Sequence, residues 1–135
     1  MANFYIAANN VDEVLRALKE NAEAALEACG QQAVSHSQQN ITAAGRIDTS
    51  AMINSMNHLV QGDTCYVGTD IEYAIYNEMG TGVYIAGGRD TPWAFQDGKG
   101  KWRRTNGMQG IHFLKNAIAN NVDEYKRIII QYLES

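Results

Sequence analysis

The sequence predicts an α+β fold in which long N-terminal and C-terminal helices pack on a small antiparallel sheet, with a long projecting loop or β-hairpin. Three observations lead to this prediction. Apolar residues recur every three or four positions near both ends of the chain. Short runs with strand propensity lie between these two segments. Eight of the twelve glycines fall between residues 80 and 110, which predicts an extended, turn-rich region there.

The length and composition are those of one globular domain. A chain of 135 residues can bury a real core, so residues 1–135 are expected to form a single domain. The net charge of −4 argues against a protein that coats nucleic acid. No apolar run approaches the roughly 20 residues that span a bilayer, and the N-terminus lacks the regions of a secretion signal. Cys29 and Cys65 fit no metal-ligand spacing; two reduced, buried thiols are expected, and a single disulfide stays open as the alternative.

One continuous apolar stripe predicts the N-terminal helix. Residues 4–7 are consistent with a short strand before it, and Asn10 can cap the helix with Glu13 as its reciprocal partner. Glycine costs about 1 kcal/mol relative to alanine in a helix interior, so we expect a bend or weak point at Gly30. Past residue 33 the pattern fades into a polar tail that could be the end of the same helix. The stripe consists of Val11, Val14, Leu15, Leu18, Ala22, Ala25, Leu26, Cys29 and Ala33.

The next elements are short. Asp48 or Thr49 can cap a short helix, because an aspartate or threonine oxygen accepts from the free N–H groups of a first turn. Residues 58–60 and 64–67 predict two strands joined by a turn at residues 61–63.

Residues 66–82 organise the chain. Asp70 can cap a helix that begins at Ile71, and Gly80 can take the left-handed conformation that ends it. Gly82 is expected to loosen the chain beyond that point. This stretch therefore predicts a short helix bearing Tyr73 and Tyr76 that aims a flexible loop outward.

A final helix is predicted after Gly110. Lys126 and Arg127 lie towards its C-terminal end, where cations interact favourably with the helix dipole. Its apolar face is formed by Leu114, Ile118, Val122, Tyr125, Ile129 and Tyr132, and is widened by Ala117, Asn121, Ile128 and Leu133.

Residues 82–107 are predicted to form the projecting loop or hairpin, with a turn at residues 97–100. Within residues 87–107 five basic residues oppose two acidic ones, a net charge of +3 that leaves −7 for the rest of the chain. Three interpretations stay open: an ordinary hairpin with one aromatic face on the body, a surface that contacts nucleic acid by stacking and phosphate pairing, or an arm that docks on a partner subunit. The residues that would make these contacts are Trp93, Phe95, Trp102, Arg103 and Arg104, with Lys101.

No motif predicts catalysis, a cofactor or a metal. His36, His58 and His112 are scattered along the chain without a nucleophile elbow or a catalytic cysteine context, so we expect satisfied or solvent-facing histidines. No His, Cys or Asp group has the spacing of a zinc or calcium site. The glycines between residues 80 and 88 lack the downstream residues of a phosphate-binding loop. The chain is therefore not expected to be an enzyme or to hold a cofactor.

Three runs, in order, carry a resemblance. Residues 45–56 (GRIDTSAMINSM) are similar to the pattern Asp-Thr-Gly-x-Leu-x-x-Ser, with Ser50 in place of the usual Gly. Residues 67–82 (VGTDIEYAIYNEMGTG) match Tyr-Ala-x-Tyr-x-Glu-x-Gly-Thr-Gly throughout, and this is the specific run. Residues 111–117 (IHFLKNA) resemble Pro-Phe-Leu-x-x-Ala, with His112 where Pro is usual. The chain thus resembles the small neck or tail-completion proteins of tailed bacteriophages and prophages, the gene-product-ten-like minor tail components of lambda-type phages.

The resemblance covers nearly the whole chain and implies a structural α+β subunit without enzymatic activity. Such a subunit completes the tail or joins head to tail by ring assembly, in the virion and, during assembly, in the host cytoplasm. The implied partners are further copies in a homo-oligomeric ring, of which a hexamer is one order, and adjacent neck, tail-terminator or tail-tube proteins. DNA would pass through the lumen without specific binding, and no membrane is involved. The alternative is a nucleic-acid-binding accessory protein that uses the basic hairpin. The motif residues look structural: Tyr73, Tyr76, Glu78, Gly80, Thr81, Gly82, Phe113 and Leu114.

Overall fold

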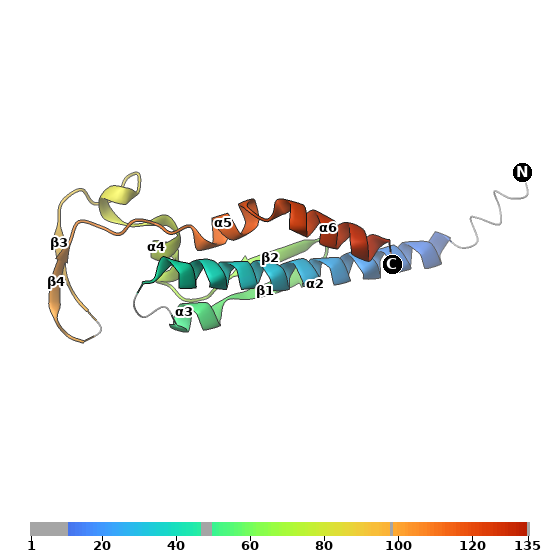
Figure 1. Cartoon of the computed structure of the whole chain (residues 1–135), viewed down its shortest axis with the longest axis horizontal. Helices are drawn as coiled ribbons and strands as arrows, with labels where there is room; N and C mark the ends of the chain where they lie inside the picture. Colours follow the sequence, from blue (N-terminus) through green and yellow to red (C-terminus); the bar gives the residue numbers. More distant parts are fainter. Residues whose placement is uncertain (1–10, 47–49, 98, 135) are drawn as a thin grey trace, which may run out of the picture.

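A computed structural model describes residues 11–46, 50–97 and 99–134 of the chain. The long helix α2 (Val11–Ala44) forms its axis. Figure 1 shows two helices along one side of α2 and a β-hairpin along another, with a second hairpin at one end of the molecule. The α+β prediction is therefore confirmed, and the strands form two separate two-stranded antiparallel sheets. The remaining elements are α3 (Ser50–Ser55), β1 (Asn57–Gln61), β2 (Thr64–Gly68), α4 (Ala74–Met79), η1 (Gly82–Tyr84), β3 (Trp93–Gln96), β4 (Trp102–Thr105), α5 (Phe113–Ala119) and α6 (Val122–Leu133).

Helix α2 runs unbroken through Gly30 and includes the whole polar tail as far as Ala44. Gly30 is the place where the first sheet approaches the helix most closely. A Cβ atom at this position would lie 2.5 Å from Cδ2 of His58 and 2.8 Å from Sγ of Cys65. The ring Nε2 of His58 in turn lies 2.7 Å from the carboxylate of Glu27, one turn earlier on α2. Gly30, where the sequence predicted a bend or weak point, is thus the position at which β1 and β2 pack most closely against α2.

The hydrophobic core lies at the C-terminal end of α2, where α3, α4 and α5 converge on it. Phe113, the first residue of α5, is 2% exposed and is the largest side chain buried at this junction. Half-buried aliphatic side chains from α2, β2 and the segment before α5 close the cluster around it. The buried members of the core are Ile41, Met52, Met56, Ala74 and Phe113.

A polar cluster ties α6 to the middle of α2. The hydroxyl of Tyr125 donates to the carbonyl oxygen of Ala117 at 2.9 Å and lies 2.9 Å from Nδ1 of His36. The other ring nitrogen of His36 is 3.2 Å from the carboxylate of Glu124. Burial, reinforced by the neighbouring Glu124 and Cys29, raises the pKa of Tyr125. The tyrosine therefore stays neutral and donates its one hydroxyl proton to α5, while its oxygen lies beside the His36 ring of α2.

Two predicted helices differ from the observed ones. The final helix is interrupted after Ala119 and resumes at Val122, because the side chain of Asn121 donates to the carbonyl oxygen of Ala117 and its backbone leaves the helical range. Helix α4 begins at Ala74 instead of Ile71, and Asp70 does not cap it. The amide of Ile71 instead donates to Oγ1 of Thr69 at 3.1 Å, which forms a turn before the helix.

The cysteines are free, as expected, but Cys29 and Cys65 are half-buried and not fully buried. Burial raises the pKa of both thiols, with the other cysteine a further contribution at Cys29 and Glu27 at Cys65. The predicted strand at residues 4–7 and the predicted caps at Asn10, Asp48 and Thr49 lie outside the described residues.

We predict that Gly30→Ala destabilises the protein, although alanine is the better helix former by about 1 kcal/mol. The added methyl group forces the His58 ring and Cys65 away from α2, and overpacking of this kind costs about 1–3 kcal/mol. Urea denaturation should therefore show a net decrease in the free energy of unfolding.

Gly68→Ala is the matched control. Gly68 ends β2, has an ordinary backbone conformation, and has nothing within 4 Å of an added Cβ. We expect a change within about 0.5 kcal/mol, as for most surface substitutions. A stabilised Gly30→Ala protein would mean that the sheet does not contact α2 as closely as described.

Candidate functional site

The projecting segment, residues 82–107, is the part of the chain that stands clear of the body; we call it the arm. In Figure 1 its hairpin, β3 and β4, lies at one end of the long axis, away from the helices. Trp102 is 69% exposed and Phe95 39% exposed. The interpretation in which one aromatic face packs on the body is therefore wrong, because no described element of the body covers these aromatic side chains.

The five residues predicted to make contacts lie on one hairpin but on two faces. Residues that are directly opposite in an antiparallel pair point to the same face, and neighbours along a strand alternate. Phe95 opposes Arg103, and Trp93 lies on the same face two residues away. Trp102 and Arg104 lie together on the other face, where their cross-strand partners are small or polar. Each face thus carries aromatic and cationic groups.

A single carboxylate organises the hairpin turn. Asp97 accepts hydrogen bonds from the amides of Lys99 and Lys101, both at 2.9 Å, and from Nε of Arg103 at 2.7 Å. The Arg103 hydrogen bond first, and then the two amides, lower the pKa of Asp97 below its ordinary value of 3.8. On the other strand, the guanidinium of Arg89 lies 5.6 Å from the centre of the Trp93 ring. Arg104 has no ion pair within the described part of the chain.

The base of the arm is a crossing of two backbone segments, residues 80–82 and 106–110, which we call the clamp. The amide of Thr81 donates to the carbonyl of Met108 at 2.8 Å, and the amide of Met108 donates to Oγ1 of Thr81 at 2.9 Å. Gly80 pairs with Gln109 in an isolated β-bridge. A Cβ at Gly82 would overlap the carbonyl of Asn106. Gly82 is buried there, so the expectation that it loosens the chain is wrong.

Two further interactions brace the clamp. Arg46, just past the end of α2, donates from Nη1 to the side-chain oxygen of Asn77 at 3.0 Å and from Nη2 to the carbonyl of Gln109. Glu78 accepts from the amides of Leu114 and Lys115, at 2.8 and 2.9 Å, and so caps α5 from outside that helix. The body therefore holds the arm from both of its backbone segments.

The other motif residues have different roles. Phe113 lies in the core and Leu114 is half-buried beside it. Tyr73 and Tyr76 are 42% and 55% exposed, so they pack little against the body. His112 has a φ of 51°, in the left-handed region, which the ring of a proline cannot adopt. The backbone before α5 therefore has a conformation that a proline at position 112 could not adopt.

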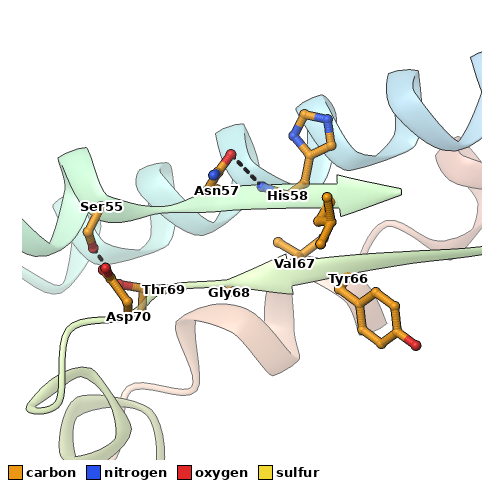
Figure 2. Close-up of a pocket in the computed structure, with 9 residues that line it drawn as sticks. Ser55, Asn57, His58, Tyr66, Val67, Gly68, Thr69 and Asp70 are labelled. Carbon is orange, nitrogen blue, oxygen red and sulfur yellow. Dashed lines mark hydrogen bonds between the residues drawn. The ribbon is translucent and has the colours of Figure 1, made fainter. Parts of the chain in front are cut away.

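The surface hollow drawn in Figure 2 does not have the features of a catalytic site. It lies at the ends of β1 and β2, with Ser55, His58 and Asp70 among its lining residues. The Ser55 hydroxyl lies 2.6 Å from the Thr69 hydroxyl and also donates to the carbonyl of Met52, and His58 is paired with Glu27. These polar groups already have structural partners. In residues 11–46, 50–97 and 99–134, no group of three His, Cys, Asp or Glu side chains could hold a metal ion.

Comparison of the chain with protein-family models, curated proteins and solved structures found no match. Among the helices described, none is long and apolar enough to cross a membrane.

We predict that Gly82→Ala disrupts the base of the arm, whereas Gly87→Ala has only a small effect. Both glycines have positive φ, 63° and 76°, so both substitutions carry about 1–2 kcal/mol of backbone strain. Only at Gly82 does the new methyl group overlap backbone atoms, because Gly87 has nothing within 4 Å. Hydrogen exchange at the Thr81 and Met108 amides should accelerate in the first variant and stay unchanged in the second. Equal protection in both would contradict the clamp.

We predict that protonation of Asp97 weakens the hydrogen bonds of the hairpin turn, and that this happens at a pH below 3.8. The folded pKa of Asp97 is depressed, so the stabilisation is present above the unfolded value and is lost as the pH falls through the folded value. An NMR titration of the Asp97 carboxyl, followed together with the Lys99 and Lys101 amides, measures this midpoint. Asp97→Asn should remove the acid transition. A midpoint at or above 3.8 would contradict the hydrogen-bonded turn.

Proposed function

We propose that this chain is a structural subunit of the neck or upper tail of a tailed bacteriophage, a prophage or a phage-tail-like particle, and that it acts by assembling into a ring. One observation carries the proposal: the residues that resemble the family motif are the same residues that hold the base of the arm. The run that matches the tail-completion family throughout, residues 73–82, supplies Glu78, Gly80 and Thr81 to the base of the arm. The family-like motif therefore serves to present an exposed arm.

The distribution of apolar side chains supports an assembling subunit. Among the described residues, eighteen large hydrophobic side chains are exposed, whereas the buried hydrophobic residues number eight, four of them alanine. Soluble monomers seldom expose large contiguous apolar patches, and such patches mark sites of association. The exposed side chains include aromatic residues on the arm and leucines on the first turns of α2.

The partners follow from this role. We propose further copies of the chain in a ring, with neck, tail-terminator or tail-tube proteins on the two faces of that ring. The body carries a net charge of −7 outside residues 87–107. A lumen lined by the body would leave DNA phosphates unneutralised, so that DNA could slide through without specific binding. The chain would act in the virion and be assembled in the host cytoplasm.

A nucleic-acid-binding accessory protein is the second candidate, and one observation favours it. Trp102 and Arg104 lie together on an exposed strand face, an arrangement that can stack on a base and pair with a phosphate. Affinity for single-stranded DNA that falls steeply with salt and is lost in an Arg103→Ala/Arg104→Ala variant would support this candidate over the ring.

We predict that the protein forms a closed oligomer and that the arm is required for it. Light scattering over a concentration series should give a mass that is a fixed multiple of the 14.9 kDa chain for the wild type. A variant in which residues 91–104 are replaced by a short Gly/Ser linker should be monomeric, because the aromatic anchors are gone while the clamp at residues 80–82 and 106–110 is retained.

Circular dichroism of that variant should match the helical content of the wild type, which separates a lost contact from a lost fold. Trp102→Ala provides a second variant with a single exposed side chain changed. A wild-type protein that stays monomeric at every concentration would contradict self-assembly.

A further inference from the structure

The end of the molecule opposite the arm carries an apolar hollow. Leu26 of α2 and Ile129 and Leu133 of α6 line it, and the turn between β1 and β2 forms its edge at Gly62. In Figure 1 the end of α6 and the early turns of α2 lie together at this end, far from β3 and β4. Leu133 is 41% exposed although it belongs to the apolar face of α6.

The apolar surface extends from this hollow along α2. Leu15 and Leu18 continue the stripe that packs on α6 further along, yet they are 58% and 46% exposed. Residues 12–20 are all exposed, because no described element covers the first turns of the helix. The same stripe therefore serves the core in its second half and is uncovered in its first half, where an apolar partner could bury it.

A second hollow lies next to the first and is acidic. Glu20, Glu23 and Glu27 line it, and it shares Glu23 and Gly62 with the apolar hollow. Glu27 is paired with His58, whereas Glu20 and Glu23 have no ion pair within the described residues. No basic side chain lines this hollow. The nearest basic side chain among the lining residues is Lys19 of the adjoining apolar hollow, and it forms no ion pair with Glu20 or Glu23 within the described residues. An arginine brought here would therefore find two carboxylates that are not already paired.

One face of the arm has the complementary pattern. Trp102 and Arg104 are two residues apart on β4, which places their Cα atoms about 7 Å apart with both side chains on the same exposed face. The two hollows are adjacent, since they share Glu23 and Gly62, and offer an apolar and an acidic environment side by side. Tryptophan and arginine are the side chains that most often anchor protein interfaces.

The arm cannot reach the hollows of its own chain. From Leu26 to the end of α2 at Ala44 the helix axis rises by about 27 Å at about 1.5 Å per residue, and the arm lies beyond that end (Figure 1). We propose that the arm of one copy docks on the neighbouring copy, with Trp102 in the apolar hollow between α2 and α6 and Arg104 on Glu20 and Glu23. The contact is head to tail, so successive copies form a ring when their rotation closes. This inference rests on the proposed assembly function and names its docking site.

A mixing experiment tests this docking site. The arm variant is Trp102→Ala/Arg104→Ala, and the hollow variant is Glu23→Arg/Leu133→Gln; all four positions are exposed, so both variants should keep the wild-type circular dichroism spectrum. Each variant alone should be monomeric in light scattering. Their equimolar mixture should form a dimer, because the intact arm of one fits the intact hollow of the other, and it should grow no further. Combining Arg104→Glu and Glu23→Arg in one chain should restore much of the wild-type assembly.

The outcomes separate this inference from the proposed function. If the wild type assembles and the hollow variant assembles equally well, the docking site is wrong while ring assembly stands. If both variants are monomeric but their mixture gives no dimer, the arm and the hollow are not partners. A wild-type monomer at every concentration would overturn both proposals. Glu72→Arg, which changes an exposed carboxylate away from both hollows, controls for a general effect of charge and should assemble as the wild type does.

Discussion

The structure depends on the close crossing of two backbone segments at the clamp. Residues 80–82 and 106–110 approach so closely that a Cβ at Gly80 would lie 2.8 Å from the Gly110 amide nitrogen and the Met108 carbonyl oxygen. Only glycine allows this approach, and the approach in turn fixes where the arm leaves the body. Arg46 links the same crossing to the end of α2, and Glu78 links it to α5. A hairpin without helices beneath it is thereby given a definite direction.

The sequence predicted the elements better than their junctions. The helical stripe of α2 and the hairpin that pairs β3 with β4 are local patterns, since each is specified within a few residues, and both were found. The clamp joins segments about 27 positions apart, so no local sequence pattern predicts it. The feature of the sequence that could have indicated it is the presence of glycines in both segments, near residues 80 and 110. The break at Asn121 was missed for a related reason, because apolar periodicity continues across it while the asparagine side chain takes a backbone acceptor.

The candidate contact residues could be selected from the sequence as a group, but the sequence alone did not show which of them share a face of the hairpin. Composition selected Trp102 and Arg104 as candidate contact residues, whereas strand register was needed to place them on one face and Phe95 with Arg103 on the other. The hollows could not be predicted. The apolar one depends on how far α6 extends along α2 before this helix ends at Leu133, and the acidic one depends on how the first sheet lies against α2. Sequence periodicity shows that a helix face is apolar, but it does not show which turns of that face a neighbouring element covers.

A head-to-tail contact of this kind has a consequence for assembly. The proposed contact uses one exposed indole, that of Trp102, and one guanidinium, that of Arg104, so a single junction buries little surface and should be weak. In an open chain of copies each added subunit gains one junction, but the subunit that closes a ring gains two. The second of these forms at the high effective concentration set by the ring itself. Weak junctions therefore favour complete rings over partial ones, and the charged part of each junction adds speed and orientation more than strength. The acidic hollow would guide the basic arm, and burial of Trp102 between α2 and α6 would hold it.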